Sequence, residues 1–192
     1  MARPREFDEG VVLRQAMELF WEQGYQATSL DELVTHLGIG RASLYAAFGS
    51  KHELFLDALD LYIRDRADRI GAALSAPGPV LPAVKQVIAG FLSRASDPDL
   101  PGCMVVNTAT ELVTTDAAAA ERVRQTWQRL EDALSEAFSR AQQQQELASD
   151  ADPQSLAAFL VVFIQGLLVV GRGDPGSARL VQATSVVEAM LG

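Results

Sequence analysis

The positions of glycine and proline constrain the fold of this chain more than any other feature of its sequence. Clusters of turn-forming residues interrupt the chain at 24, 38–40, 49–50, 75–79, 96–102, 149–153 and 171–176. Between these clusters apolar residues recur three and four positions apart, as Val12, Ala16 and Leu19 do, which is the period of one helix face. The pattern predicts an all-α fold of about nine helices: 9–23, 30–37, 41–48, 51–74, 80–95, 103–112, 116–145, 154–170 and 177–191.

Polar side chains mark the starts of two of these predicted helices. Ser29 and Glu32 have the spacing of a capping box, in which the serine oxygen and the glutamate carboxylate bind free backbone amides. Ser50 and Glu53 repeat this spacing before the fourth predicted helix. The third predicted helix follows Gly40, which has no side chain to cap it, so we expect a weaker start there.

The composition is that of a globular protein. The 192 residues, 48% of them hydrophobic, can bury a core as one domain or as a small domain joined to a larger one. A single cysteine, Cys103, excludes an internal disulfide. Residues 1–7 lack the apolar region of a secretory signal, so we expect a cytoplasmic protein. The longest apolar stretch, 156–170, is interrupted by Gln165 and Gly166 and is expected to be too short to cross a membrane.

Charge and the supply of catalytic groups argue against several function classes. The net charge of -9 argues against non-specific coating of nucleic acid, which needs a basic surface. The two histidines, His36 and His52, belong to no cluster with metal-ligand spacing, and no glycine-rich phosphate loop follows a strand. We therefore predict no enzyme activity, no metal and no cofactor.

The predicted helix at 154–170 is apolar nearly all round, so it must be covered on two sides. Together with the helix at 177–191 it predicts a four-helix interface between two copies of the chain. The alternative is that 154–170 is simply the central helix of the core.

The helices at 30–37 and 41–48, joined by a glycine-containing turn, have the lengths of a helix-turn-helix unit. Ile39, Leu44 and Phe48 are predicted to face inward. Small and hydrogen-bonding residues that permit close approach to a DNA groove are predicted to face outward: Arg41, Ala42, Ser43, Tyr45 and Ala46. Other small helical bundles also contain short helices joined by glycines, so spacing alone leaves both interpretations open.

A denser set of residues lies between positions 8 and 56: Ala16, Leu19, Phe20, Gly24, Tyr25, Thr28, Ser29, Leu37, Gly38, Ile39, Ser43, Leu44, Tyr45, Phe48, Ser50, Lys51, Glu53 and Leu54. This set resembles the N-terminal domain of the TetR family of bacterial transcriptional regulators. The resemblance implies a DNA-binding head at 6–66 and a ligand-binding and dimerisation body at 67–192. It also implies a homodimer that binds a palindromic operator as a repressor and is released by a small-molecule inducer.

The resemblance places the recognition helix near residues 40–46. It implies phosphate contacts from Thr28, Tyr45 and Lys51, and Arg41 is the candidate for a contact to a guanine edge or to a further phosphate. Ala47 stands where many family members carry histidine, so one backbone contact is missing.

The N-terminal part of the chain, residues 1–55, has five basic residues against eight acidic ones. We therefore expect its carboxylates, Asp31 and Glu32 among them, to cap helices or to lie away from the operator. Arg3 and Arg5 are expected to reach the DNA.

In the body, the segment from Gly102 to Leu112 resembles a Gly-Cys-x-x-x-Asn-Thr-x-x-Glu-Leu signature in a subgroup of these regulators. Its polar members, Cys103, Asn107 and Glu111, are four residues apart and share a helix face. We expect them to edge a pocket for a mostly apolar ligand. The predicted walls are aromatic: Tyr62, Phe91, Trp127, Phe159 and Phe163. Each of these aromatic residues alone is also typical of a helical core.

The sequence leaves two further functions open. Cys103, at a helix start that favours a thiolate, is a candidate sensor of electrophiles, although a buried cysteine is more often an inert apolar residue. A dimeric helical adaptor with a degenerate head would also fit the acidic surface.

Overall fold

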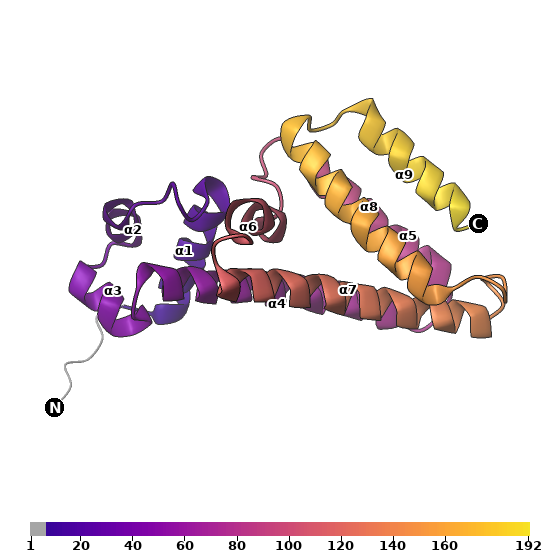
Figure 1. Ribbon diagram of the computed structural model, residues 1–192, viewed down its shortest axis with the longest axis horizontal. Coiled ribbons are helices and arrows are strands. Elements are labelled where there is room, and N and C mark those ends of the chain that lie inside the picture. The colour runs from indigo at the N-terminus through magenta and orange to yellow at the C-terminus, as the bar shows by residue number, and fades with distance from the viewer. Residues whose placement is uncertain (1–6) are drawn as a thin grey trace.

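The computed structural model describes residues 7–192, and this part of the chain contains nine α-helices and no strand (Figure 1). The helices are α1 Glu9–Gln23, α2 Leu30–Leu37, α3 Arg41–Phe48, α4 Lys51–Ser75, α5 Val80–Ala95, α6 Met104–Leu112, α7 Ala117–Gln143, α8 Pro153–Gly173 and α9 Ala178–Met190. The all-α prediction is confirmed. Arg3 and Arg5 lie outside the described residues.

The two predicted capping boxes differ in the structure. At α2 the Ser29 hydroxyl accepts from Glu32 N–H at 3.1 Å, and the Glu32 carboxylate accepts from Ser29 N–H at 2.8 Å. At α4 the Ser50 hydroxyl accepts from Glu53 N–H at 3.0 Å, but Ser50 N–H donates to the Phe48 carbonyl. The second box therefore forms only its serine half. Gly40 caps α3 without a side-chain hydrogen bond, as expected.

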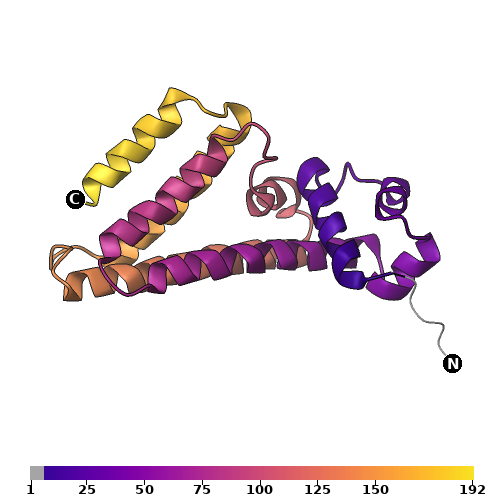
Figure 2. The same ribbon diagram turned by 180° about the vertical axis from the view of Figure 1, so that it is seen from behind.

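Two long helices connect the ends of the molecule. α4 and α7 run side by side along its length, with the head, α1–α3, at one end (Figures 1 and 2). α5 and α8 rise from the other end, and α9 returns along them. The predicted boundary between residues 66 and 67 falls inside α4, which is unbroken from Lys51 to Ser75.

The core of the head includes residues of the body. Phe20 of α1 and Phe55 of α4 meet edge to face at 5.3 Å, and both are buried. Met104 of α6 and Val123 of α7 belong to the same buried cluster. The head is therefore held directly by α6 and by the start of α7, because burial of this shared apolar surface opposes their separation.

α8 is longer than its sequence indicated. The glycine cluster after Val170 predicted a turn, but the helix continues through Gly171 and ends at Gly173, before Pro175. A Cβ atom on Gly171 would lie 2.3 Å from the Ala95 carbonyl oxygen of α5. Gly171 therefore permits a close approach of two helices rather than a turn.

The added length changes one prediction about α8. At 21 residues, with a mean hydropathy of 2.1 over its most apolar window, α8 is the one helix in residues 7–192 that is long and apolar enough to cross a membrane. The expectation that this stretch is too short was therefore wrong. The core helix of a soluble protein has the same properties, and α8 packs along α5 and α7.

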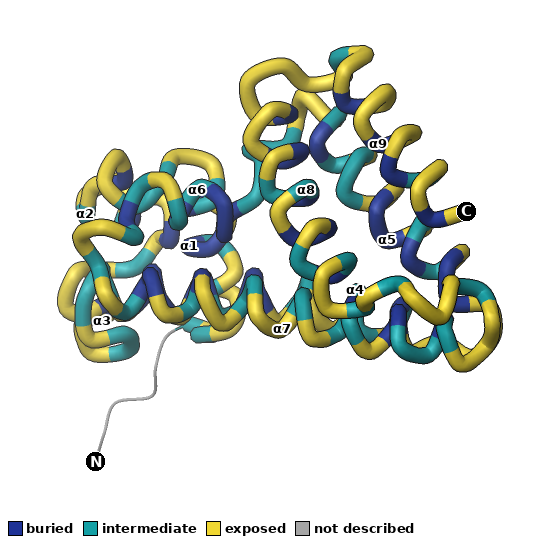
Figure 3. The backbone as a smooth tube through the Cα atoms, turned by 45° about the vertical axis from the view of Figure 1, so that its right-hand side comes forward, coloured by how far each residue is buried: buried dark blue, intermediate teal, exposed yellow. Residues whose placement is uncertain are grey.

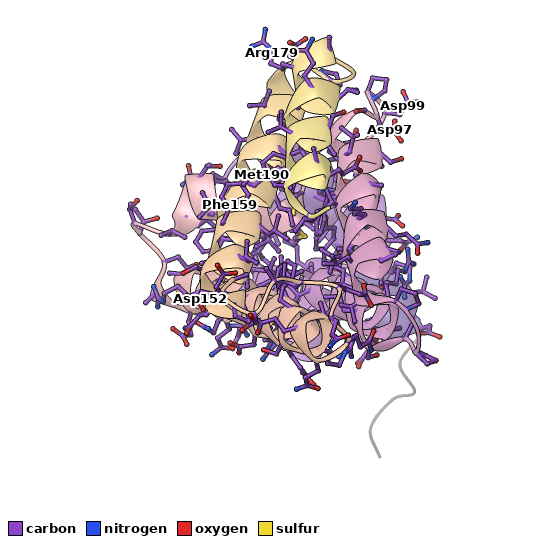
Figure 4. The ribbon with its side chains drawn as sticks, turned by 90° about the vertical axis from the view of Figure 1, so that its right-hand side faces the viewer. Asp97, Asp99, Asp152, Phe159, Arg179 and Met190 are labelled. Atoms are coloured by element: carbon purple, nitrogen blue, oxygen red, sulfur yellow. The ribbon has the colours of Figure 1, made fainter. Side chains whose placement is uncertain are left out.

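Many residues of α8 and α9 are exposed (Figure 3), and several of them are large and apolar. Of the nine large hydrophobic residues most exposed in the described chain, seven lie on these two helices: Phe159, Val162, Val169, Val170, Val181, Val186 and Met190. Phe159 and Met190 lie at the same end of the molecule (Figure 4). The opposite side of α8 is buried, with Leu160 and Ile164 almost fully enclosed. α8 is therefore a core helix that also has an uncovered apolar side.

Candidate functional site

The outer face of α3 has the predicted arrangement. Gly38 ends α2 in the left-handed region at φ 65° and ψ 22°, which turns the chain sharply into α3. Leu44 is fully buried and anchors the helix. The five residues predicted to face outward are all exposed: Arg41, Ala42, Ser43, Tyr45 and Ala46. Tyr45 leaves 47% of its surface accessible. The first turn of α3 has no side-chain cap, so no capping side chain occupies its first backbone amides.

Arg41 has a partner within the head. Its Nη2 donates to the Asp31 carboxylate in the first turn of α2, and both side chains are exposed. This hydrogen bond and the charge of Asp31 raise the pKa of Arg41 above its ordinary value. Asp31 restrains the guanidinium beside α3, and the expectation that Asp31 caps a helix or lies away from the operator stays a prediction.

Two other residues predicted to contact phosphates, Thr28 and Lys51, donate hydrogen bonds to backbone carbonyls within the head. Thr28 is fully buried, and its hydroxyl donates to the Gly24 carbonyl at 2.6 Å, so the prediction of a phosphate contact from this side chain was wrong. The Lys51 ammonium donates to the Tyr25 carbonyl at 2.6 Å and lies 4.3 Å from the centre of the Tyr25 ring. Burial lowers the pKa of Lys51. Lys51 thus holds the α1–α2 connection to α4, and two of its three N–H groups are left for a phosphate.

Several hydrogen bonds join the head to α6 and its flanking loops. The Glu111 carboxylate accepts from Gln26 N–H at 2.6 Å and from Tyr25 N–H at 3.2 Å. Trp21 Nε1 donates to the Gly102 carbonyl at 3.1 Å. Glu111, predicted to edge a pocket, is therefore part of the joint between head and body.

The start of α7 joins the head as well. His52 Nε2 lies 2.6 Å from the Asp116 carboxylate, and the same carboxylate accepts from the N–H groups of Ala118 and Ala119. Burial opposes ionisation of Asp116, but these hydrogen bonds and His52 outweigh it and lower its pKa. Asp116 is thus both the cap of α7 and a contact to α4.

A cavity of about 440 Å³ lies in the body between α4, α5, α7 and α8. Four residues predicted from the sequence line it together, namely Tyr62, Phe91, Cys103 and Trp127. Its volume falls within the usual range for small-molecule sites.

The other predicted pocket residues lie elsewhere. Asn107 donates to the Pro101 carbonyl at 3.0 Å and Glu111 holds the head, so neither lines the cavity. Phe163 packs in the core of the body, and Phe159, with 43% of its surface exposed, stacks on it from outside at 6.3 Å. The pocket prediction was wrong for these four residues, because helix periodicity does not show which side of a helix faces a cavity.

The charged residues of the cavity were not predicted from the sequence. Arg66 and Arg94 line it next to Tyr62, whose hydroxyl accepts from Arg94 Nη2 at 3.3 Å. Burial raises the pKa of Tyr62 and lowers the pKa of Arg66. Arg66 and Arg94 are on different helices and belong to no motif, so only the fold brings them together.

Comparison with known proteins decides the family. The profile described as "Bacterial regulatory proteins, tetR family" matches residues 12–58. The profile described as "Tetracyclin repressor-like, C-terminal domain" matches residues 80–184, more than half of the chain. The chain belongs to the TetR family. Members of this family are DNA-binding transcriptional regulators and not enzymes.

Three relatives match along most of the chain. The HTH-type transcriptional regulator YezE of Bacillus subtilis is 37% identical over 162 residues, covering 83% of this chain and 84% of YezE. The HTH-type transcriptional repressor ComR of Escherichia coli is 32% identical over 182 residues, covering 94% of this chain and 87% of ComR. The structure of a cysteine mutant of the TetR family regulator CifR, complexed with 26-bp operator DNA, superimposes with a TM-score of 0.84 at 29% identity and covers 99% of this chain and 98% of CifR.

Proposed function

We propose that this TetR-family regulator is a repressor that binds a palindromic operator as a homodimer and is released when a small molecule enters its cavity. The observation that carries DNA binding is the exposed face of α3 above the buried Leu44. In this proposal Arg41 contacts a base edge, Tyr45 and Lys51 contact phosphates, and the small side chains of Ala42, Ser43 and Ala46 let α3 enter the major groove.

The proposal assigns DNA binding to residues 6–66, and ligand binding and dimerisation to residues 67–192. It places the protein in the cytoplasm, where operator DNA and the inducer are its partners.

The apolar side of α8 and α9 supports the homodimer. Val162 and Met190 are 72% and 63% exposed, and a patch of such residues is costly to leave in water. A two-fold pairing of α8 and α9 would cover it in both copies, because a two-fold interface uses the same surface twice. Such a pairing sets the separation of the two α3 helices, which must be about 34–36 Å for half-sites one DNA turn apart.

The joint between head and body supports release by a ligand. The cavity residue Tyr62 lies 5.3 Å from Trp21 of α1, ring centre to ring centre, and α6 holds the α1–α2 connection through Glu111. A ligand that favours a different placement of α4 or α6 would move the head. It would then shift the dimer population away from the operator-binding geometry.

The test is fluorescence anisotropy of the full chain titrated onto a duplex from the region upstream of its own gene. A scrambled duplex at the same near-physiological salt concentration is the control, because phosphate contacts alone depend steeply on salt. Tight binding to the first duplex alone is expected. Weak, equal binding to both, repeated across a wider duplex library, would overturn operator recognition and favour a helical adaptor.

A second candidate function uses the Cys103 thiol as an electrophile sensor. The observation that favours it is the place of Cys103 on the wall of the cavity, beside Tyr62. N-ethylmaleimide is a suitable probe, because the thiol adds across its double bond and the thiol proton moves to the ring carbon. Release of operator DNA by this reagent in the wild type but not in Cys103→Ser would support the sensor.

A further inference from the structure

The charges that line the cavity are all of one sign. Four arginines line it, Arg66, Arg69, Arg94 and Arg129, and no aspartate or glutamate of the described residues does. The whole chain carries 25 acidic residues against 16 basic ones, so this distribution is opposite to that of the protein as a whole.

Aromatic rings hold Arg66 and Arg94 on the wall of the cavity. The Arg66 guanidinium lies 5.0 Å from the centre of the Tyr62 ring, and the Arg94 guanidinium lies 5.6 Å from the centre of the Trp21 ring. Both arginines are half-buried, and within residues 7–192 neither has a carboxylate at ion-pairing distance. A buried guanidinium without an anionic partner costs free energy, which an anion would reduce.

Apart from the four arginines, the cavity wall is mainly apolar and carries no charge. Ile63, Ile70, Val87, Phe91 and Leu130 contribute apolar side chains, and Gln86, Thr126 and Gln165 contribute neutral polar ones. Trp127 also lines the cavity and adds aromatic surface to this wall.

A second hollow differs in charge and serves as a comparison. This hollow has a volume of about 610 Å³ and is lined by residues of α1 and of the loop after α5. Asp97 and Asp99 lie on that loop (Figure 4). Glu18 and Glu22 line the hollow together with Arg94 and Arg172, so charges of both signs are present. This mixed lining has no preference for an anion.

From these observations we propose that the cavity binds an apolar carboxylate, with its acid group between Arg66 and Arg94 and its hydrocarbon body along the apolar wall. This inference rests on the proposed function of a ligand-released regulator and names the chemical class of the ligand. A carboxylate accepts from two guanidinium groups at once, whereas an amide or an alcohol of the same shape forms weaker, uncharged hydrogen bonds. Because both arginines contact Trp21 of α1, the bound acid group lies one side chain away from the head.

The test is isothermal titration calorimetry of the full chain without DNA. The probes are decanoate, 4-phenylbutanoate and 2-naphthoate, and each is compared with its primary amide. The choice of acids distinguishes a preference for aliphatic acids from a preference for aromatic acids. We expect at least one acid to bind about tenfold or more tightly than its amide. The double variant Arg66→Gln with Arg94→Gln is expected to bring that acid and its amide within about twofold of each other.

Two further variants separate charge from folding. Arg64→Gln removes an exposed arginine of α4 outside the cavity and is expected to leave the preference for the acid unchanged. Arg66→Lys with Arg94→Lys keeps the charge and is expected to keep part of the preference, even if the glutamine pair folds poorly. Equal binding of acids and amides by the wild type, or no binding of any of the three acids, would overturn the inference.

Operator binding without ligand distinguishes this failure from failure of the proposed function. A wild-type chain that binds its operator but shows no preference for acids contradicts only the ligand class. A chain that binds the acids through Arg66 and Arg94 but binds no operator contradicts only the proposed function.

Discussion

The head and the cavity hold their cations in different ways. In the head, Arg41 is paired with the Asp31 carboxylate, and the Lys51 ammonium is bound to the Tyr25 carbonyl. In the cavity, Arg66 and Arg94 contact aromatic rings, and the one oxygen bound to Arg94 belongs to the neutral Tyr62 hydroxyl. Arg41 and Lys51 already have oxygen partners within the protein, whereas Arg66 and Arg94 have no anionic partner among the described residues.

This difference shows how the two regions divide their tasks. In the proposed function, Arg41 and Lys51 are held in place before DNA is bound, which lowers the entropic cost of forming a specific interface. In the same proposal, Arg66 and Arg94 gain most when a ligand brings the missing negative charge. A regulator needs both properties, a fixed recognition surface and a site whose electrostatic energy changes on ligand binding.

The largest effect is expected from breaking the apolar side of α8 and α9. Val162→Glu combined with Val186→Glu places four carboxylates in the proposed two-fold interface and should yield monomers. Operator affinity should then fall about 100-fold or more, because two linked heads bind far more tightly than one. Light scattering measures the mass, and fluorescence anisotropy measures the affinity for the operator. Val11→Glu, at an exposed apolar position of α1, is the control and should keep the mass of the wild type. A double variant that stays dimeric would contradict the interface.

A smaller effect tests the packing of the body. Gly171→Ala should lower the free energy of unfolding by about 2 kcal/mol, because the new Cβ meets the Ala95 carbonyl and overpacking outweighs the helix preference of alanine. Urea denaturation measures the change. Gly173→Ala, at a position where a Cβ atom would have no neighbouring atom within 4 Å, should change stability by less than about 1 kcal/mol. Equal effects of the two substitutions would show that α8 and α5 can separate without penalty.

Three substitutions in the head test the proposed binding of DNA by α3. Arg41→Ala should reduce the preference for the operator over a singly mutated operator by about tenfold, because a lost base contact costs roughly 1–3 kcal/mol. Tyr45→Phe should weaken binding to all duplexes equally, since it removes a phosphate contact. Asp31→Asn should raise affinity for operator and scrambled duplexes alike by removing a negative charge beside α3. Anisotropy titrations measure all three, and unchanged selectivity in Arg41→Ala would remove Arg41 from base recognition.

The smallest effect concerns the joint between the two regions. Asp116→Ala should cost about 1 kcal/mol of stability at pH 7, because it removes the cap of α7 and the contact to His52. The pKa of Asp116 is lowered in the folded state, so its contribution is complete above the ordinary value of 3.8 and is lost as the pH falls through the folded-state value. The difference between wild type and variant, measured by urea denaturation from pH 7 to pH 2.5, should shrink only at the acidic end. A difference that stays constant below pH 3 would contradict a role of the carboxylate charge.

Features that depend on neighbouring residues were predicted correctly from the sequence more often than contacts between residues far apart in the chain. The helix at 41–48 and the capping box at Ser29 were predicted correctly, because each depends on residues within one or two helical turns. Glu111 was assigned to a pocket although it binds the backbone of Tyr25 and Gln26, about 85 residues earlier in the chain. No local pattern distinguishes these two roles for a glutamate on a helix face.

The sequence by itself determined the helices, except the end of α8, and the outward face of α3, because caps, turns and helix periodicity act over short distances along the chain. A resemblance between residues of the head and a known family indicated the TetR family. The tertiary structure decided which groups meet: Gly171 against Ala95, Glu111 on the head, and Arg66 with Arg94 on the wall of a cavity. These contacts depend on how helices far apart in the sequence cross and rotate to bury their apolar sides, and many such arrangements share the same helix pattern.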